Sequence, residues 1–409
     1  MKHFIYLIGI FTFLFVSCDS ELPQDSDDDK VAEDIQDIAD ANLSFSWDLF
    51  KTSVEQEDSG NNILLSPLSV QTALNMALNG AKGQTQSQIQ SVLHSGNFDL
   101  ESLNDKQGDW LSLLQKEGDH AELTVANVLF SDPARVDISN EFEQKIDQHY
   151  NAPHFKKDFS NPVTKSEINN WVKEQTKQKI DGIIEQISPN DIAFLINALY
   201  FKADWSKGFD PDHTRARAFQ LENGNSVNTD FVNGDRNFSF VQKSDFEAVD
   251  IPFKDSIYSL TLMQPNRDLY TTDDWIKNLD GSFLKEAYEQ MQYSRAMVQF
   301  PILDLSYKKD LKKYLQILGI EDAFMNTAAD FSRMGDPISG PNIFISSVAH
   351  KSVLKVDEKG AEGAAATSVG FSVTSLPPSL IFDQSFVIVL RHIPTNTVLF
   401  IGKVADPTA

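Results

Sequence analysis

An α+β fold is predicted for this chain, because helical and strand patterns both occur along one continuous stretch. Four apolar residues recur at the spacing of one helix face: Ile35, Ile38, Phe45 and Leu49. Residues 193–201 are almost wholly apolar, which is typical of a strand buried on both faces, and residues 215–300 alternate short strands with turns. Since residues 38–409 contain no linker-like stretch, internal repeat or low-complexity block, we expect them to form one domain.

Capping and turn residues set the bounds of the first elements. Residues 61–65 have the pattern of a short strand, Ser66 followed by proline predicts a helix start, and Gly80 predicts its end. Thr85 with Gln88 three residues later predicts a capping box for the next helix. Further patterns predict a strand over 123–130 and helices over 141–150 and 308–318.

The composition indicates a soluble globular protein, with 41% hydrophobic and 23% charged residues among 409. The formal net charge is −24, and a surface of that sign repels phosphate backbones and other polyanions. We therefore expect no nucleic-acid partner. No cofactor is expected, and the protein is expected to be a monomer.

The N-terminal residues have the pattern of an export signal. Residues 4–16 are almost wholly apolar, too few for a membrane-spanning helix but enough for a signal-peptide core. Residues 15–18 resemble a bacterial lipobox, in which the single cysteine, Cys18, becomes the lipidated first residue. This predicts a lipoprotein signal peptide over 1–17 and an acidic tether over 18–37. The alternative is a plain secretory signal.

A lipidated Cys18 has consequences for location and chemistry. The protein is then expected in the bacterial cell envelope, on the outer membrane or cell surface, with a lipid as its only membrane attachment; otherwise it is secreted. The folded part would contain no thiol, so a disulfide or a cysteine-ligated metal is not expected.

Residues 358–378 have the pattern of a strand with one buried face. One alternate set is small and then apolar: Ala361, Gly363, Ala365, Thr367, Val369, Phe371 and Val373. The other set is polar or small: Glu362, Ala364, Ala366, Ser368, Gly370, Ser372 and Thr374. Yet alanine and glycine have weak strand preference, and two prolines at 377–378 end any ladder. This predicts a loop that can join a sheet later.

The same stretch resembles the hinge of the serpins, a family of serine protease inhibitors. The similarity includes the run G-A-E-G-A-A-A-T over 360–367, the segments 350–353 and 357–360 before it, and 375–378 and 399–407 after it. It extends over 38–409 and implies three β-sheets, about nine helices and an exposed reactive centre loop. The residues it implies for the hinge are Glu358, Gly360, Ala361, Glu362, Gly363, Ala364, Ala365, Ala366 and Thr367.

The resemblance also implies two structural clusters around the point where the sheet opens. A polar cluster called the shutter is implied for Ser66, Ser69, Asn197 and His350. A second site, called the breach, is implied for Trp205 and Glu358. Many serpins pair that glutamate with a lysine, but the matching position here is Ile302, so the usual salt bridge is not expected.

The sequence does not indicate an enzyme. It has no G-x-S-x-G elbow, no H-E-x-x-H helix and no phosphate-binding glycine loop, and its eight histidines are scattered. His350 near Ser66 and Ser69 might suggest a catalytic cluster. We interpret it as structural because His350 lies in a strand-like run. No metal site is expected.

The resemblance implies a suicide inhibitor. A protease attacks the loop, an acyl-enzyme forms, and the cut loop inserts into the large sheet, moving the protease by about 50 Å at ~3.3 Å per residue. Counting from both ends of the loop places the reactive bond at Thr374–Ser375, which suits elastase-like serine proteases. Two alternatives stay open: papain-like cysteine proteases, which would favour Val373, and a non-inhibitory binding lipoprotein whose loop is only a substrate.

Overall fold

The computed structural model describes residue 31 and residues 34–115, 121–189, 191–254, 256–338, 342–361 and 377–409. Within these ranges it contains nine α-helices: α2 (Gln36–Gln56), α3 (Pro67–Gly80), α4 (Gly83–Val92), α5 (Leu100–Leu114), α6 (Asn140–Tyr150), α7 (Thr164–Gln175), α8 (Thr272–Asn278), α9 (Phe283–Glu289) and α10 (Lys312–Leu318). The strands before residue 260 are β1 (Ile63–Leu65), β2 (Ala121–Ser131), β3 (Val136–Ile138), β4 (His154–Lys156), β5 (Ala193–Asp204), β6 (Arg215–Gln220), β7 (Ser226–Gln242), β8 (Phe246–Pro252) and β9 (Tyr258–Pro265). The later strands are β10 (Gln292–Pro301), β11 (Leu303–Asp310), β12 (Gly335–Pro337), β13 (Ala349–Val356), β14 (Gly360–Ala361), β15 (Ser379–Ile381), β16 (Phe386–His392) and β17 (Thr397–Val404).

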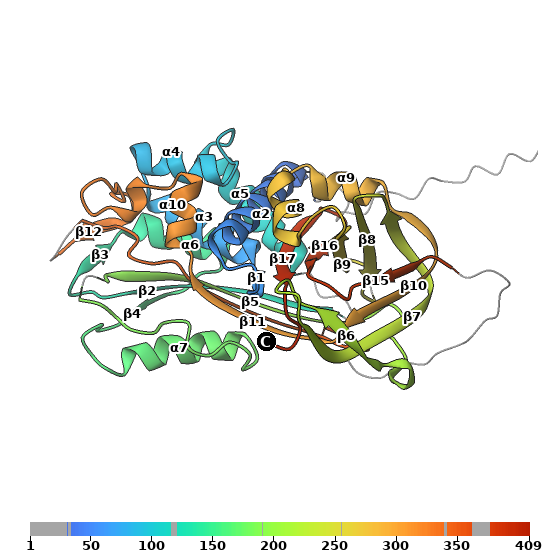
Figure 1. Ribbon diagram of the computed structural model, residues 1–409. Helices are drawn as coiled ribbons and strands as arrows, with labels where there is room; N and C mark the ends of the chain where they lie inside the picture. The colour runs from blue at the N-terminus through green and yellow to red at the C-terminus, as the bar shows by residue number, and fades with distance from the viewer. Residues whose placement is uncertain are drawn as a thin grey trace, which may run out of the picture.

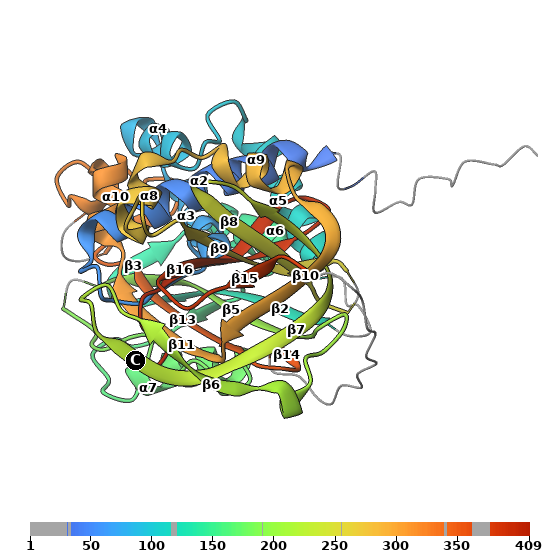
Figure 2. The same ribbon diagram turned by 45° about the vertical axis from the view of Figure 1, so that its right-hand side comes forward.

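A nine-stranded sheet forms the core at one end of the molecule. Its strand order is β1-β17-β16-β9-β8-β7-β10-β15, and β6 pairs with β7 beside this path. Every residue of β9, β16 and β17 is buried, which agrees with their mostly apolar sequence. The strands β6, β7 and β10 lie at the side of the molecule that comes forward in Figure 2.

A second layer consists of two smaller sheets that run side by side. One has the order β14-β5-β2-β4 and the other pairs β11 with β13. The layer lies between α3 on one face and α7 on the opposite face (Figure 1). On β5, Leu199 and Phe201 belong to the main core with α3, whereas Ile196 and Ala198 pack with Ile168 and Val172 of α7. Side chains of β5 therefore alternate between two cores.

The α+β fold class is confirmed, and two local predictions are wrong. The helix predicted after Gly80 is not capped by Thr85 and Gln88, because it begins earlier, at Gly83. Both side chains instead accept hydrogen bonds from distant backbone amides, Thr85 from Asp330 and Gln88 from Glu321 and Asp322. The helix expected over 308–318 is α10 only from 312 onward, since residues 308–310 complete β11.

Neither a membrane span nor a metal cluster is found in the part of the chain that the structure describes. No helix there is long and apolar enough to cross a bilayer, and no group of three or more His, Cys, Asp or Glu side chains is arranged to hold a metal ion. The apolar run at 4–16 and Cys18 lie outside the described residues.

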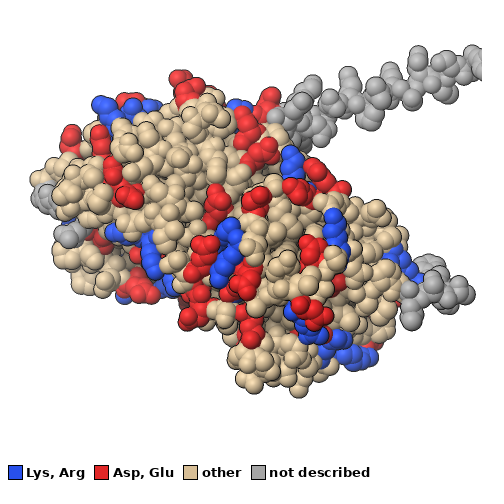
Figure 3. Space-filling view, turned by 45° about the horizontal axis from the view of Figure 1, so that its top comes forward, with Lys and Arg blue, Asp and Glu red and all other residues tan. Residues whose placement is uncertain are grey.

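Charged side chains are interspersed on the face drawn in Figure 3. Lys and Arg lie scattered among Asp and Glu there, without gathering into one basic patch. Binding of a phosphate backbone needs several cations on one surface.

Candidate functional site

The central feature is a seam between β5 and β13. The edge of β5 that faces away from the seam pairs with β2 over residues 193–203. The edge of β13 that faces away from the seam pairs with β11 over residues 349–356. In the described residues no ladder joins the facing edges of β5 and β13, although residues of both strands line the same two pockets. A strand edge without a ladder is a template for another strand, so the seam can accept one.

One end of the seam already holds the start of such a strand. In β14, Gly360 pairs with Asp204 and Ala361 pairs with Ala203, antiparallel to β5. Ala361 is 1% exposed and belongs to the main core. Gly360 has a φ of +150°, and a Cβ there would lie 2.1 Å from the Ala203 carbonyl oxygen. Only glycine fits this close approach, so the hinge starts inside the sheet.

Trp205 fixes the segment that leads into β14. Its backbone N–H donates to the Lys359 carbonyl at 2.8 Å, and its indole N–H donates to the Asp357 carbonyl at 2.8 Å. The indole ring stacks on Phe253, with 4.5 Å between ring centroids and 6° between the planes. Trp205 therefore connects the base of the loop to the core through one rigid side chain.

Glu358, the other predicted breach residue, has a neutral partner. Its Oε1 accepts a hydrogen bond from the Thr214 hydroxyl at 2.6 Å, while Ile302 packs against the core. The Glu358 carbonyl accepts a hydrogen bond from Phe209 N–H at 2.7 Å. Sequence reasoning gave no signal for Thr214, because it lies 144 positions away in the chain.

Three of the four predicted shutter residues meet beneath the seam. Ser66 Oγ donates to Ser69 Oγ at 3.0 Å, and the Ser66 backbone N–H donates to His350 Nε2 at 3.3 Å. His350 Nε2 also lies 2.7 Å from the hydroxyl of Ser352, which the sequence did not identify. These groups form a buried polar cluster that connects β13 to the start of α3.

The fourth shutter residue, Asn197, lies across the seam on β5 and has a different partner. Its amide Nδ2 donates to Asn127 Oδ1 at 2.7 Å, and Asn127 in turn donates to the Tyr150 carbonyl at 2.7 Å. Asn197 Oδ1 is fully buried and has no hydrogen-bond partner among the described groups. Such a group costs roughly 1–3 kcal/mol until it is satisfied.

Burial of His350 makes the native state sensitive to acid. Burial lowers the pKa of His350 from 6.5 to about 4, and burial likewise lowers the pKa of His392 to about 4. The unfolded chain therefore binds more protons than the native state between pH 4 and 6.5, so stability is complete above 6.5 and falls as the pH decreases toward 4. Each histidine contributes a loss of up to about 3 kcal/mol.

We expect the urea midpoint of the native protein to fall between pH 6.5 and pH 4. Replacing His350 with Gln removes one titrating group, so the midpoint of that variant should depend less steeply on pH over this window. Urea unfolding at half-unit pH intervals measures both slopes. An equal slope in wild type and His350→Gln would contradict the role of His350.

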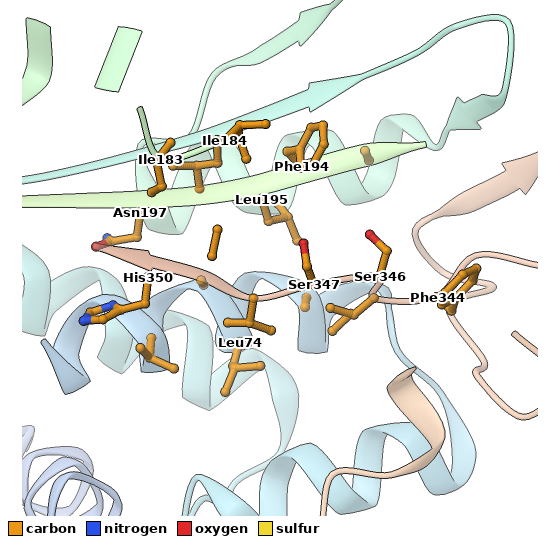
Figure 4. Close-up of a pocket in the computed structure, with 18 of the residues that line it drawn as sticks. Leu74, Ile183, Ile184, Phe194, Leu195, Asn197, Phe344, Ser346, Ser347 and His350 are labelled. Carbon is orange, nitrogen blue, oxygen red and sulfur yellow. The ribbon is translucent and has the colours of Figure 1, made fainter. Parts of the chain in front are cut away.

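A cavity of about 120 Å³ lies in the seam at the end remote from β14 (Figure 4). Its walls come from α3, from the first residues of β5, from residues 343–350 and from Ile183 and Ile184. Asn197 and His350 lie at one end of it and Phe344 at the other. The seam is thus not filled by side chains along its whole length.

A connection after α7 covers the seam from outside. Residues 176–187, which we call the strap, place Lys179 and Ile180 over Leu199 and Val353. Two ion pairs join the strap to the far side of the seam: Asp181 to Lys351 at 3.1 Å and Glu185 to Lys308 at 2.8 Å. Both carboxylates are exposed, and pairs of this kind contribute little. The strap is held mainly by the buried Ile180, Ile183 and Ile184 and by hydrogen bonds between the Asn169 side chain and the Ile184 backbone.

A serine, a histidine and a glutamate form a row elsewhere, at the edge strand β4. Ser131 Oγ lies 2.7 Å from His154 Nε2, and His154 Nδ1 lies 3.2 Å from a Glu143 carboxylate oxygen, without the alignment of a hydrogen bond. Ser131 is only 1% exposed. Since a nucleophile must reach its substrate, this row joins β2, β4 and α6 and does not form a hydrolytic site.

The remaining predicted site residues cannot be placed. The hinge residues beyond Ala361 and the reactive bond lie outside the described residues: Glu362, Gly363, Ala364, Ala365, Ala366, Thr367, Thr374 and Ser375. The described chain stops at Ala361 and resumes at Pro377.

Comparison with known proteins establishes the family. The family described as serpin (serine protease inhibitor) matches residues 40–407, so this chain belongs to the serpins. Human Serpin B3 is 30% identical and covers 90% of this chain, with 99% of the relative matched. A leukocyte elastase inhibitor from Xenopus tropicalis is also 30% identical, with 91% of this chain and 100% of the relative matched.

Solved structures agree on the fold. Tengpin, a thermophilic serpin, has a TM-score of 0.83 in its native state, at 29% identity over 90% of this chain and 94% of that chain. In its latent state the TM-score is 0.77. Human thyroxine-binding globulin in complex with its ligand has a TM-score of 0.82, at 26% identity over 92% of this chain and 100% of that chain. The fold is thus shared by serpins of different function.

Proposed function

We propose that this protein is a suicide inhibitor of serine endopeptidases that traps its target by inserting its cleaved loop into the seam between β5 and β13. The observation that carries the proposal is the pair of facing strand edges without a ladder, with β14 already occupying the first two positions between them. Relatives named as elastase inhibitors support the choice of target class.

The register of β14 specifies where each inserted residue would lie. Gly360 faces Asp204 and Ala361 faces Ala203, so each further loop residue would face the preceding residue of β5. Continued in this way, Thr367 would face Asn197 and Phe371 would face Ala193. Directly opposed side chains in an antiparallel pair lie about 5 Å apart on the same face. The Thr367 hydroxyl would then lie within reach of the unpartnered Asn197 Oδ1.

The same register explains the small side chains of the hinge. Odd-numbered residues of β5, such as Leu199 and Phe201, face the core beside α3, so odd-numbered loop residues would face it too. Those residues begin with Ala361, Gly363 and Ala365. A closely packed interior accepts small groups without displacing neighbours. Glu362 would face the other side, toward α7.

Insertion would release free energy that the native molecule retains. A strand placed between β5 and β13 pairs along both edges, and each net hydrogen bond contributes about 0.5–1.5 kcal/mol. Over about ten residues this is on the order of 10 kcal/mol, before any gain from filling the cavity. The native state would then persist because conversion is slow, not because it is the most stable arrangement.

Mixing the protein with pancreatic elastase tests this function. We expect an adduct that survives SDS, in which the Thr374 carbonyl is esterified to the catalytic serine of the protease and the Ser375 amine has left, because a small β-branched residue suits a shallow specificity pocket. Clean cleavage at that bond without an adduct would show that the loop is only a substrate, as in a serpin with a carrier role. A parallel reaction with papain tests the cysteine-protease alternative, for which the apolar Val373 is the relevant residue.

We further propose that the protein is an envelope lipoprotein attached through Cys18. The lipobox-like residues 15–18 and the acidic stretch that follows support this placement. Metabolic labelling with radioactive palmitate should mark the wild type and not Cys18→Ala when the full chain is expressed in a bacterial host. Absence of label in the wild type would contradict lipidation and indicate a secreted protein instead.

A further inference from the structure

The cavity in the seam has an apolar lining with a few polar groups at its margin. Its apolar walls are formed by Leu74 and Ala77 of α3, Leu195 of β5, Ile343, and Phe331 and Met334. Among the described residues that line it, none carries a formal charge at neutral pH, because burial lowers the pKa of His350 to about 4. A charged occupant would lose its hydration without compensation, so the cavity favours an uncharged one.

The size of the cavity limits the occupant to about one ring. Its volume is about 120 Å³, and an apolar cavity of roughly 150 Å³ in another protein binds benzene. The walls are joined across the seam by two exposed ion pairs, by hydrogen bonds from Lys308 and Lys351 to strap carbonyls, and by a hydrogen bond from Ser346 to Asp191.

One polar atom indicates which kind of ring fits best. Asn197 lines the cavity at the end shared with His350, and its Oδ1 is buried without a hydrogen-bond donor. Its Nδ2 is already engaged with Asn127. In Figure 4 the amide points toward that end and away from the other lining residues, so an occupant with a hydroxyl or N–H group directed to that end can satisfy this oxygen, whereas a plain hydrocarbon leaves it unsatisfied.

We propose that this cavity is a binding site for a small uncharged aromatic molecule with one hydrogen-bond donor, of the phenol type, and that its occupation regulates the inhibitor. The regulatory part rests on the proposed function. A molecule there lies beside residues 193–197 of β5, which the last part of an inserted strand would have to pair with. Occupation therefore delays insertion. When insertion is slow, the acyl-enzyme hydrolyses first and the protease is released after cleavage.

Binding is measured on the intact protein, without a protease. Titration calorimetry with phenol at pH 7.5 should give a dissociation constant in the millimolar range, and a saturating concentration should raise the melting temperature by a few degrees. Benzene should bind several-fold more weakly, and benzoate should not bind. Absence of phenol binding, or benzoate binding as tightly as phenol, would overturn the proposal.

Two variants fill the cavity from opposite walls. Ala73→Met enlarges a side chain of α3, and Ala193→Val enlarges one of β5; both residues line the cavity. Each should weaken phenol binding at least about tenfold. Ala216→Met, on an exposed position of β6, makes a matched change elsewhere and should leave binding unchanged. Equal affinity in the variants would place the ligand at another site.

The functional consequence has a separate readout. With phenol present, the fraction of elastase trapped as adduct should fall and the fraction of cleaved inhibitor should rise, and Ala73→Met should not respond. If phenol binds but elastase is never trapped in any condition, the proposed function fails and the binding site stands. If elastase is trapped and bound phenol leaves the partition unchanged, the regulatory part is wrong.

Discussion

Replacing Ala361 with Arg should convert the inhibitor into a substrate of elastase. Ala361 is 1% exposed and lies in the core opposite Ala203. A guanidinium cannot be buried there without a partner, at a cost of several kcal/mol, so the first position of the inserted strand would be excluded from the seam. We expect at least a tenfold loss of SDS-stable adduct, with cleavage of the loop unaffected.

The matched control places the same side chain one position further along. Glu362→Arg would face away from the core by the register of β14, so it should keep the ability to trap elastase. Gel analysis of both variants at equal protease ratios measures the difference. Normal trapping by Ala361→Arg, or equal loss in both variants, would contradict the alternation on which the insertion depends.

Removing the indole of Trp205 should have the second large effect. Trp205→Ala deletes the stacking on Phe253, the volume of the ring and the indole N–H that donates to the Asp357 carbonyl, and keeps only the backbone hydrogen bond to Lys359. Truncation of a buried tryptophan costs about 3–5 kcal/mol. We expect the melting temperature of the native form to fall by several degrees, and the protein to lose inhibitory activity on storage as β14 extends into the seam uncut.

Trp205→Phe separates packing from hydrogen bonding. It keeps an aromatic ring over Phe253 and loses the indole N–H to the Asp357 carbonyl together with part of the ring volume, so about 1–2 kcal/mol should be lost. Differential scanning calorimetry and residual inhibition after incubation at 37 °C measure both effects. A Trp205→Ala protein as stable and as durable as wild type would show that the breach does not restrain the loop.

Features that depend on local sequence could be predicted. The start of α3 follows from Pro67 at its first position, although Ser66 makes no capping hydrogen bond. The inward position of Ala361 follows from the alternation of small and polar residues, which the core placement of that residue matches. In both cases a short stretch of chain contains the whole signal.

Features that depend on distant partners could not be predicted from the sequence. Thr85 and Gln88 have the spacing of a capping box, but the chain near residues 321–330 packs against them and takes up both side chains. Asn127, the partner of Asn197, lies 70 positions away. Nothing in a single sequence marks such pairs, because they arise only when strands are brought together in a sheet.

The measurement that tests the central idea most directly is calorimetry of the intact protein beside the same protein cut once at Thr374–Ser375. If the cleaved loop inserts into the seam between β5 and β13, the cleaved form should melt at least about 10 °C higher, given a gain in folding free energy on the order of 10 kcal/mol. Coincident melting curves would mean that cleavage releases no free energy by strand insertion, and trapping by insertion would be excluded.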